Sequence, residues 1–175
     1  GMEQHERELA LTKFRNGSHK IIIATDLASR GLDIERINYI IHYHLPPHEH
    51  EFIHRNGRTA RMDKDGTVYV LKHHSDPSPT FIPPLKPAIF KNKEFEANQD
   101  WVTVMISGGR KDRISKGDVA GFLMKQGELK NEEVGLIELK QKITFVAIEK
   151  NSSEKIISKI DGLRLKTKKI RANLV

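Results

Sequence analysis

Cysteine is absent from the 175 residues of this chain. Disulfide bonds and thiolate metal ligands are therefore excluded, and a cytoplasmic protein is expected. The chain also lacks any apolar run of about 18 residues, so no membrane-spanning helix is predicted. The first residues are polar and do not contain the apolar stretch of a signal peptide.

The net charge of +7 lies in the C-terminal part of the chain. Residues 1–100 contain 14 Lys and Arg and 14 Asp and Glu, whereas residues 101–175 contain the other 16 basic and 9 acidic residues. All nine histidines precede residue 75. The difference predicts two modules, of which the basic one binds a polyanion.

A proline-rich segment lies between the two parts. Five of the seven prolines fall in DPSPTFIPPLKP, residues 76–87, and proline interrupts both helices and strand ladders. We therefore predict a first domain at 1–75, a linker at 76–98 and a second domain at 99–175. The apolar residues of the linker indicate that part of it packs onto a domain.

The first domain shows alternating helix and strand patterns. A helix is predicted over 3–15, with Asn16-Gly17 as its end, and strands are predicted over 20–25, 37–45 and 66–73. Pro46-Pro47 opens a second helix. This alternation predicts an α/β three-layer fold with a parallel sheet. Ligands of such sheets bind beyond the carboxyl ends of the strands, where ATDLASRGLD, residues 24–33, begins.

The second helix is expected to carry HRNGRTAR, residues 54–61, with three arginines and no carboxylate. In a helix, His54, Arg58 and Arg61 would share one face. Arginine stays charged and its planar fork fits phosphate oxygens. The alternative is a solvated basic helix without a ligand.

Three segments together resemble motifs of the DEAD-box RNA helicases. ATDLASRGLD resembles motif V, HRNGRTAR resembles motif VI, and EQHER, residues 3–7, resembles motif IVa. The resemblance implies part of the second RecA-like domain of such an enzyme. It implies that Arg58 and Arg61 are catalytic arginine fingers at the terminal phosphate of ATP. It also implies that Asp33 contacts the ribose of the nucleotide. The implied RNA contacts are Gln4, Arg7 and Thr25.

Other motifs of that family are missing from the sequence. It contains no GxxxxGK[ST] phosphate loop and no Asp-Glu-Ala-Asp. The resemblance therefore implies that the chain is a C-terminal fragment, whose partner is the N-terminal motor domain of the same protein. The full-length parent would use ATP and Mg²⁺ as an RNA-stimulated ATPase, whereas this chain alone is expected to be inactive and to hold no cofactor.

A cluster of histidines is a candidate metal site. Imidazole is a common metal ligand, and five histidines fall within thirteen residues, at His42, His44, His48, His50 and His54. The segment crosses from a strand through Pro-Pro into a helix, so the side chains do not share one face. Surface and turn histidines are the better interpretation, and no metal site is predicted.

The second domain has the pattern βαββαβ. Strands are predicted over 101–107, 134–140, 142–149 and 163–175, and helices over 116–126, capped by Ser115, and 151–160. This order predicts an α+β ferredoxin-like domain of the RRM type. GGRKDRISKGD, residues 108–118, resembles the RNA-binding domain of the DbpA-type helicases. The resemblance implies that the partner is structured RNA, in particular ribosomal RNA in ribosome assembly. No membrane partner is expected, because the sequence has no long apolar run.

Few aromatic residues occupy the positions where an RRM-type sheet stacks bases. Of Ile143 and Phe145, only Phe145 is aromatic, so we expect charge to dominate RNA binding. The predicted contacts are the cations of the first turn, Arg110, Lys111, Arg113 and Lys116. A second basic group lies on the last predicted strand, at Lys166, Lys168, Lys169 and Arg171, although solvated lysines remain an alternative.

The combined interpretation is the C-terminal part of an ATP-dependent RNA helicase that remodels structured RNA. The alternative is a non-enzymatic RNA-binding protein with a degenerate motor remnant. A DNA-directed helicase fits less well, because TDLASRGLD followed by HRNGRTAR is the RNA-helicase form of these motifs.

Overall fold

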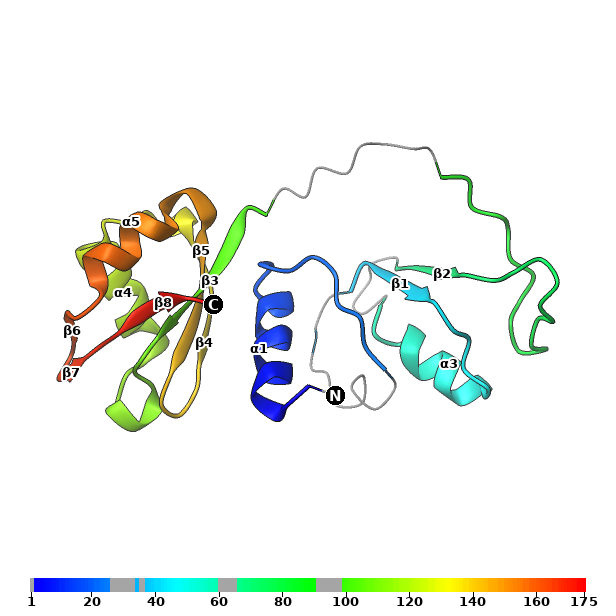
Figure 1. Cartoon of the computed structure of the whole chain (residues 1–175), viewed down its shortest axis with the longest axis horizontal. Coiled ribbons are helices and arrows are strands. Elements are labelled where there is room, and N and C mark those ends of the chain that lie inside the picture. The colour runs from blue at the N-terminus through cyan, green and yellow to red at the C-terminus, as the bar shows by residue number, and fades with distance from the viewer. Residues whose placement is uncertain (1, 26–33, 35–36, 60–65, 91–98) are drawn as a thin grey trace. The chain divides into compact units, whose positions relative to one another are not determined.

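The computed structural model describes residues 2–25, 34, 37–59, 66–90 and 99–175 (Figure 1). The chain forms two compact units, residues 23–95 and residues 1–22 together with 96–175. The first twenty-two residues thus belong by contact to the unit that contains the basic C-terminal part. In the described part of the chain, no helix combines the length and the apolar character that crossing a membrane would need.

The unit of residues 23–95 contains a small parallel sheet. Strands β1 (Tyr39–His42) and β2 (Thr67–Val70) pair in parallel, from Tyr39 opposite Thr67 to His42 opposite Val70. Helix α3 (Glu49–Asn56) lies between them in sequence. The strand–helix–strand order with parallel pairing confirms this part of the prediction, since parallel strands require a crossover connection.

The strand predicted over 20–25 is not formed. Its residues have no regular secondary structure, and Ile21 and Ile23 are 71% and 96% exposed. An apolar run becomes a central strand only where neighbours pair with its backbone and cover both faces. Among the described residues, β1 and β2 pair only with each other, so this segment has no ladder to join.

The proline-rich segment is irregular but packs locally. Within residues 76–90 the structure shows no helix or strand. Two of its aromatic rings contact the same unit, Phe81 at 5.9 Å from Phe52 of α3 and Phe90 at 5.6 Å from Tyr69 of β2, measured between ring centroids. The prediction that part of this segment packs onto a domain is supported by both contacts.

The other unit contains a four-stranded antiparallel sheet. Its elements follow the order β3 (Trp101–Ile106), α4 (Lys116–Gly127), β4 (Val134–Leu139), β5 (Thr144–Glu149), α5 (Lys150–Ile160) and β8 (Ala172–Leu174). The strands are arranged β4-β5-β3-β8, and every neighbouring pair is antiparallel. The predicted order βαββαβ is therefore confirmed, with 3₁₀ turns η1 (Arg110–Asp112) and η2 (Asn131–Glu133) added in the loops.

Helices α4 and α5 cover one face of this sheet and form its core. Ser115 caps α4 as predicted, because its hydroxyl oxygen accepts a hydrogen bond from the backbone N–H of Asp118 at 3.2 Å. The apolar side chains of both layers are almost fully buried, at Val104, Ile106, Leu123, Val146, Ile148, Ile156 and Ile160. The fold of this unit thus rests on one compact hydrophobic core.

The C-terminal residues form a hairpin and a short strand instead of the single strand predicted over 163–175. Strands β6 (Arg164–Leu165) and β7 (Lys168–Lys169) pair around Lys166, whose φ of 56° is left-handed, before β8 begins. Leu165 and Ile170 are 4% and 0% exposed. Five positions apart, they would point to opposite faces of one strand, whereas the reversal lets both be buried.

Helix α1 (Gln4–Arg15) is formed as predicted and ends at Asn16 and Gly17. Gly17 has a φ of +81°, which glycine adopts without strain. The buried residue of the helix is Thr12, while Leu9, Leu11 and Phe14 are only half-buried. The helix is therefore held in part by polar contacts, which are described below.

Candidate RNA and nucleotide sites

The arginine-rich motif begins in a helix and continues in a turn. Helix α3 ends at Asn56, and the following N–H groups bond three residues back, Arg58 to the carbonyl of Arg55 at 3.2 Å and Thr59 to that of Asn56 at 3.0 Å. The hydroxyl of Thr59 donates to the carbonyl of Ile37 at 2.5 Å. Because α3 ends before Arg58, the prediction that His54 and Arg58 share one helical face is wrong, while Arg61 lies outside the described residues. Gly57 has a low helix propensity, and the Thr59 bond directs the chain toward β1.

The predicted nucleotide residues are only partly described. Arg58 is half-buried just beyond α3, whereas Asp33 and Arg61 lie outside the described residues. Thr25 is exposed in the irregular segment before residue 26. Gln4 and Arg7 are exposed on the first turns of α1, where Gln4 donates to Glu8 at 3.3 Å and Arg7 to the carbonyl of Met2 at 3.2 Å. Gln4 and Arg7 belong to the unit of residues 1–22 and 96–175, whereas Thr25 and Arg58 belong to that of residues 23–95.

A buried histidine fixes the start of the arginine-rich motif, which the sequence alone did not indicate. His42 is 2% exposed; its Nε2 lies 2.8 Å from Oδ1 of Asn56, and its Nδ1 lies 3.3 Å from Nη1 of Arg55. A neutral ring with its proton on Nε2 satisfies both contacts. Arg55 also donates to the carbonyl of His44 at 2.9 Å, and Phe52 stacks on His42 at 4.8 Å. These contacts attach α3 to the carboxyl end of β1.

The remaining histidines show no metal-binding geometry. His50 lies with its ring centroid 5.6 Å from that of His48 and 6.4 Å from that of His54. Over the described ranges of the chain, no group of three His, Asp or Glu side chains is placed to hold a metal ion. His42, His48, His50 and His54 instead contact other aromatic rings.

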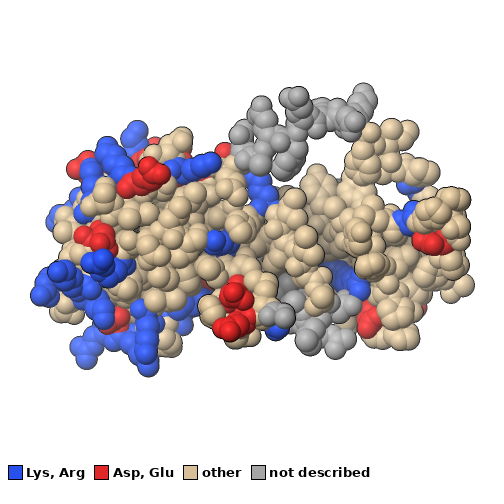
Figure 2. All heavy atoms as spheres, viewed as in Figure 1, with Lys and Arg blue, Asp and Glu red and all other residues tan. Residues whose placement is uncertain are grey.

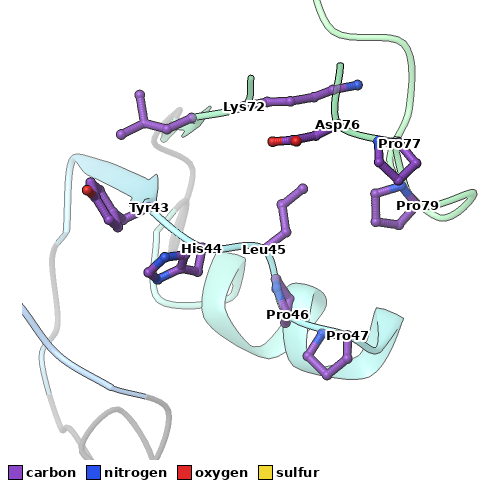
Figure 3. A pocket seen from close by; sticks show the side chains of 10 residues that line it. Tyr43, His44, Leu45, Pro46, Pro47, Lys72, Asp76, Pro77 and Pro79 are labelled. Carbon is purple, nitrogen blue, oxygen red and sulfur yellow. The ribbon is translucent and has the colours of Figure 1, made fainter. Parts of the chain in front are cut away.

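An open hollow of about 350 Å³ lies at the carboxyl ends of both parallel strands (Figure 3). Leu45 follows β1 and points across the hollow toward Asp76, and Lys72 follows β2. The ammonium group of Lys72 donates to the hydroxyl of Ser78 at 2.6 Å. This is the edge where ligands of parallel sheets bind, but its lining is mainly proline, apolar and aromatic.

The first turn of the basic unit is a rigid support for exposed cations. The backbone N–H groups of Arg110 and Lys111 donate to the carbonyls of Lys140 and Gln141, both at 2.9 Å. The N–H of Gly109 donates to Asp112 at 3.1 Å. Arg110, Lys111, Arg113 and Lys116 are all exposed, so the predicted RNA-binding group is presented together in η1 and at the start of α4.

Two of the last lysines, Lys166 and Lys168, contact residues of this turn or the start of α4. The ammonium group of Lys166 lies 2.6 Å from a carboxylate oxygen of Asp118, and that of Lys168 lies 3.5 Å from Asp112. The hydrogen bonds from Lys166 and Ser115 lower the pKa of Asp118 to about 2. Two positive charges of the second basic group are thus paired with acids beside η1. Figure 2 shows many Lys and Arg side chains on the visible surface of this unit.

The one aromatic residue at the third-strand positions where an RRM-type sheet stacks bases is not accessible. Phe145 is 7% exposed, on the sheet face opposite α4 and α5, in register with Met105 and Glu138. Ring stacking needs an open aromatic face. In this conformation, the exposed cations of η1 are therefore better placed for RNA than the sheet.

Comparison with known families defines the class of protein. Residues 1–63 match the helicase conserved C-terminal domain, and residues 103–174 match the DbpA RNA binding domain. The chain thus joins part of a helicase C-terminal domain to an RNA-binding domain. Its predicted relation to the DEAD-box RNA helicases of the DbpA type is confirmed by these matches and by curated relatives that cover nearly the whole chain.

Two of these relatives are ATP-dependent RNA helicases named DbpA. The protein of Bacillus subtilis is 27% identical over 99% of this chain, and that of Escherichia coli is 28% identical over 99%. The chain spans 42% and 40% of their respective lengths. The DEAD-box ATP-dependent RNA helicase CshC of Bacillus cereus is 47% identical, but over 39% of this chain and 18% of its own length.

Proposed function

We propose that this chain acts in an ATP-dependent RNA helicase that remodels structured RNA, with ribosomal RNA in ribosome assembly as its substrate. The observation that carries this proposal is the cluster of exposed cations at η1, fixed by backbone hydrogen bonds to the turn after β4. The cluster lies within the DbpA RNA-binding match, and both DbpA relatives are named ATP-dependent RNA helicases.

Within that enzyme, we assign residues 1–75 to the second RecA-like domain, 76–98 to the linker and 99–175 to a ferredoxin-like, RRM-type domain. The strand order β4-β5-β3-β8 with two helices on one face supports the last assignment. The parallel pair β1 and β2 with α3 between them supports the first.

ATP and Mg²⁺ would bind with the help of the first motor domain, because this sequence contains no phosphate loop. Arg58 and Arg61 would stabilise charge on the transferred phosphoryl group, and Asp33 would contact the ribose. Arg58 lies in a turn fixed on both sides, by the His42 contacts of Arg55 and Asn56 and by the Thr59 bond to Ile37. A fixed backbone is what a positioned arginine finger requires.

RNA would contact the second domain through Arg110, Lys111, Arg113 and Lys116, and the first through Gln4, Arg7 and Thr25. Each phosphate that a Lys or Arg neutralises releases counterions, so the affinity should fall steeply with salt. Reversal of three charges at η1 should therefore weaken RNA binding. It should also reduce the slope of log affinity against log salt concentration by the equivalent of roughly three phosphate contacts.

The test is binding of the full chain to a ribosomal-RNA hairpin across a salt series. The variant is Arg110→Glu/Lys111→Glu/Arg113→Glu, and the matched control reverses three exposed lysines elsewhere in the same unit, Lys125, Lys130 and Lys155. The control should retain most of the RNA affinity and most of its dependence on salt, whereas the η1 variant should lose most of both. A salt-insensitive affinity, or equal losses in both variants, would contradict the assignment of the RNA site.

A further inference from the structure

The sheet of the basic unit is covered on both faces. Residues of β5 alternate, so Val146 and Ile148 point into the core with α4 and α5. Phe145 and Ala147 point to the opposite face, yet they are 7% and 0% exposed. In a two-layer domain this second face would be open to solvent. Another element must therefore pack against it.

The C-terminal half of α1 makes the first set of contacts with this face. The guanidinium group of Arg15 donates to both carboxylate oxygens of Glu138 on β4, at 2.7 Å from Nε and 3.0 Å from Nη2. The hydroxyl of Thr12 donates to the same carboxylate at 3.2 Å. A two-point arginine–carboxylate pair of this kind fixes orientation as well as distance.

The residues after α1 make a second, buried set of contacts. The amide of Asn16 donates to the hydroxyl of Thr103 on β3 at 2.9 Å, and the hydroxyl of Ser18 lies 2.8 Å from the same oxygen. Asn16, Ser18 and Thr103 are 8%, 4% and 1% exposed. Buried polar groups are stabilising only when they are paired, so each side of this contact needs the other.

The chemistry of this face suits a protein segment better than a nucleic acid. Burial disfavours the charged form of Glu138, but hydrogen bonds and charge from Arg15 and Lys140 outweigh burial and lower its pKa. The face therefore carries an ionised carboxylate, which attracts a guanidinium group and repels phosphate. Phe145 lies on the same face, in register with Glu138, and its side chain is buried, so it offers no open ring for a base.

We propose that this sheet face is a docking surface for a helix, that its occupant is α1 of the same chain, and that α1 stays docked when RNA binds at η1. The docking rests on the contacts above alone. The expectation that α1 stays docked when RNA binds rests also on the proposed function. We expect this because η1 is attached to the turn after β4 by backbone hydrogen bonds that involve none of the residues that contact α1.

Hydrogen exchange of α1 and the fluorescence of Trp101 can report docking in the full chain. A helix of 12 residues is marginal in water when isolated, so its amides should exchange fast once it undocks. Trp101 is the single tryptophan, and a Cβ added at Gly17 would lie 3.8 Å from its Cδ1 atom. Its emission should therefore change when the end of α1 leaves the sheet.

Arg15→Glu and Glu138→Arg should each speed exchange in residues 4–15 by roughly tenfold or more, because each breaks a charged, partly buried hydrogen bond. The combined swap should restore most of the protection. Lys13→Glu, the same charge change in the same last turn of α1, should change exchange by about twofold or less. Unchanged protection of β5 in all variants shows that the sheet remains folded.

Equal protection of α1 in the single variants and the wild type would overturn the docking surface. Saturation with the RNA hairpin should leave α1 protection and Trp101 emission of the wild type unchanged. Loss of α1 protection on RNA addition would overturn the persistence of docking. Absence of RNA binding would contradict the proposed function and the persistence that rests on it, while the variants without RNA still decide the docking.

Discussion

Gly109→Ala tests how far the backbone contact beneath η1 stabilises the turn that we propose as the RNA-binding site. A Cβ at this position would lie 2.4 Å from the carbonyl oxygen of Lys140 and 2.7 Å from the carbonyl atoms of Gln141. Ordinary contact begins at 3.4 Å, so the two backbones must separate by about 1 Å (3.4 − 2.4). The φ of Gly109 is −157°, which any residue adopts, so the effect is steric.

The magnitude follows from the bonds that this separation breaks. Two backbone hydrogen bonds of 2.9 Å, from Arg110 and Lys111, would be lost. At about 1 kcal/mol each, with about 1–3 kcal/mol for overpacking, the free energy of unfolding should fall by about 3–5 kcal/mol. For a domain of this size, that corresponds to a decrease in Tm of at least about 12 °C.

Thermal unfolding followed by Trp101 fluorescence measures this change in the unit that contains β3. The matched control is Gly121→Ala in α4, where an added Cβ meets nothing within 4 Å. The control should raise stability by about 0.5–1 kcal/mol, because alanine favours the helix. A Tm of Gly109→Ala within about 2 °C of the wild type would refute the reasoning, since that shift is below 1 kcal/mol.

Three further predictions concern catalysis and charge. The purified chain should neither bind ATP tightly nor hydrolyse it, because it contains no phosphate loop; RNA-stimulated ATP turnover by the chain alone would contradict this. In the full-length enzyme, Arg58→Ala or Arg61→Ala should lower kcat by about 10³-fold, as loss of an arginine finger does, and a change of only a few-fold would exclude that role. Because the pKa of Asp118 is lowered from 3.8 to about 2, its ionised contacts with Lys166 and Ser115 stabilise the fold above pH 3.8 and are lost as the pH falls toward 2. The Tm difference between wild type and Asp118→Asn should therefore be full at pH 7 and disappear below pH 2, and a pH-independent difference would contradict this.

Elements with strong local signals could be predicted from the sequence. The Ser115 cap and the apolar pattern of α4 are encoded within a single turn and helix, and the alternation of β3 predicts its strand directly. The exposure of the η1 cations was also predictable, since Lys and Arg side chains are almost never fully buried unless they are paired. Local chemistry was sufficient in each of these cases.

The errors arise where distant residues decide the local structure. Residues 20–25 have the composition of a central strand but pair with no strand among the described residues. The last predicted strand reverses because Leu165 and Ile170 are both buried. The pairing of His42 with Asn56 was missed because both residues are polar and fourteen positions apart.

Helix α1 shows how one element can serve two parts of the chain. Its sequence lies within the helicase match, whereas Arg15 of the helix contacts β4, and Asn16 just beyond it contacts β3, of the domain that matches the DbpA RNA-binding family. Interfaces between domains are more polar than cores and are correspondingly easier to open. The predicted RNA contacts Gln4 and Arg7 lie at the start of this helix and Arg15 at its end, eleven residues or about 16 Å from Gln4 along the axis. If the first turn of α1 binds RNA while its last turn stays on the RNA-binding domain, one rigid helix connects the RNA to that domain. Movement of the RNA then requires movement of the domain, and the reverse.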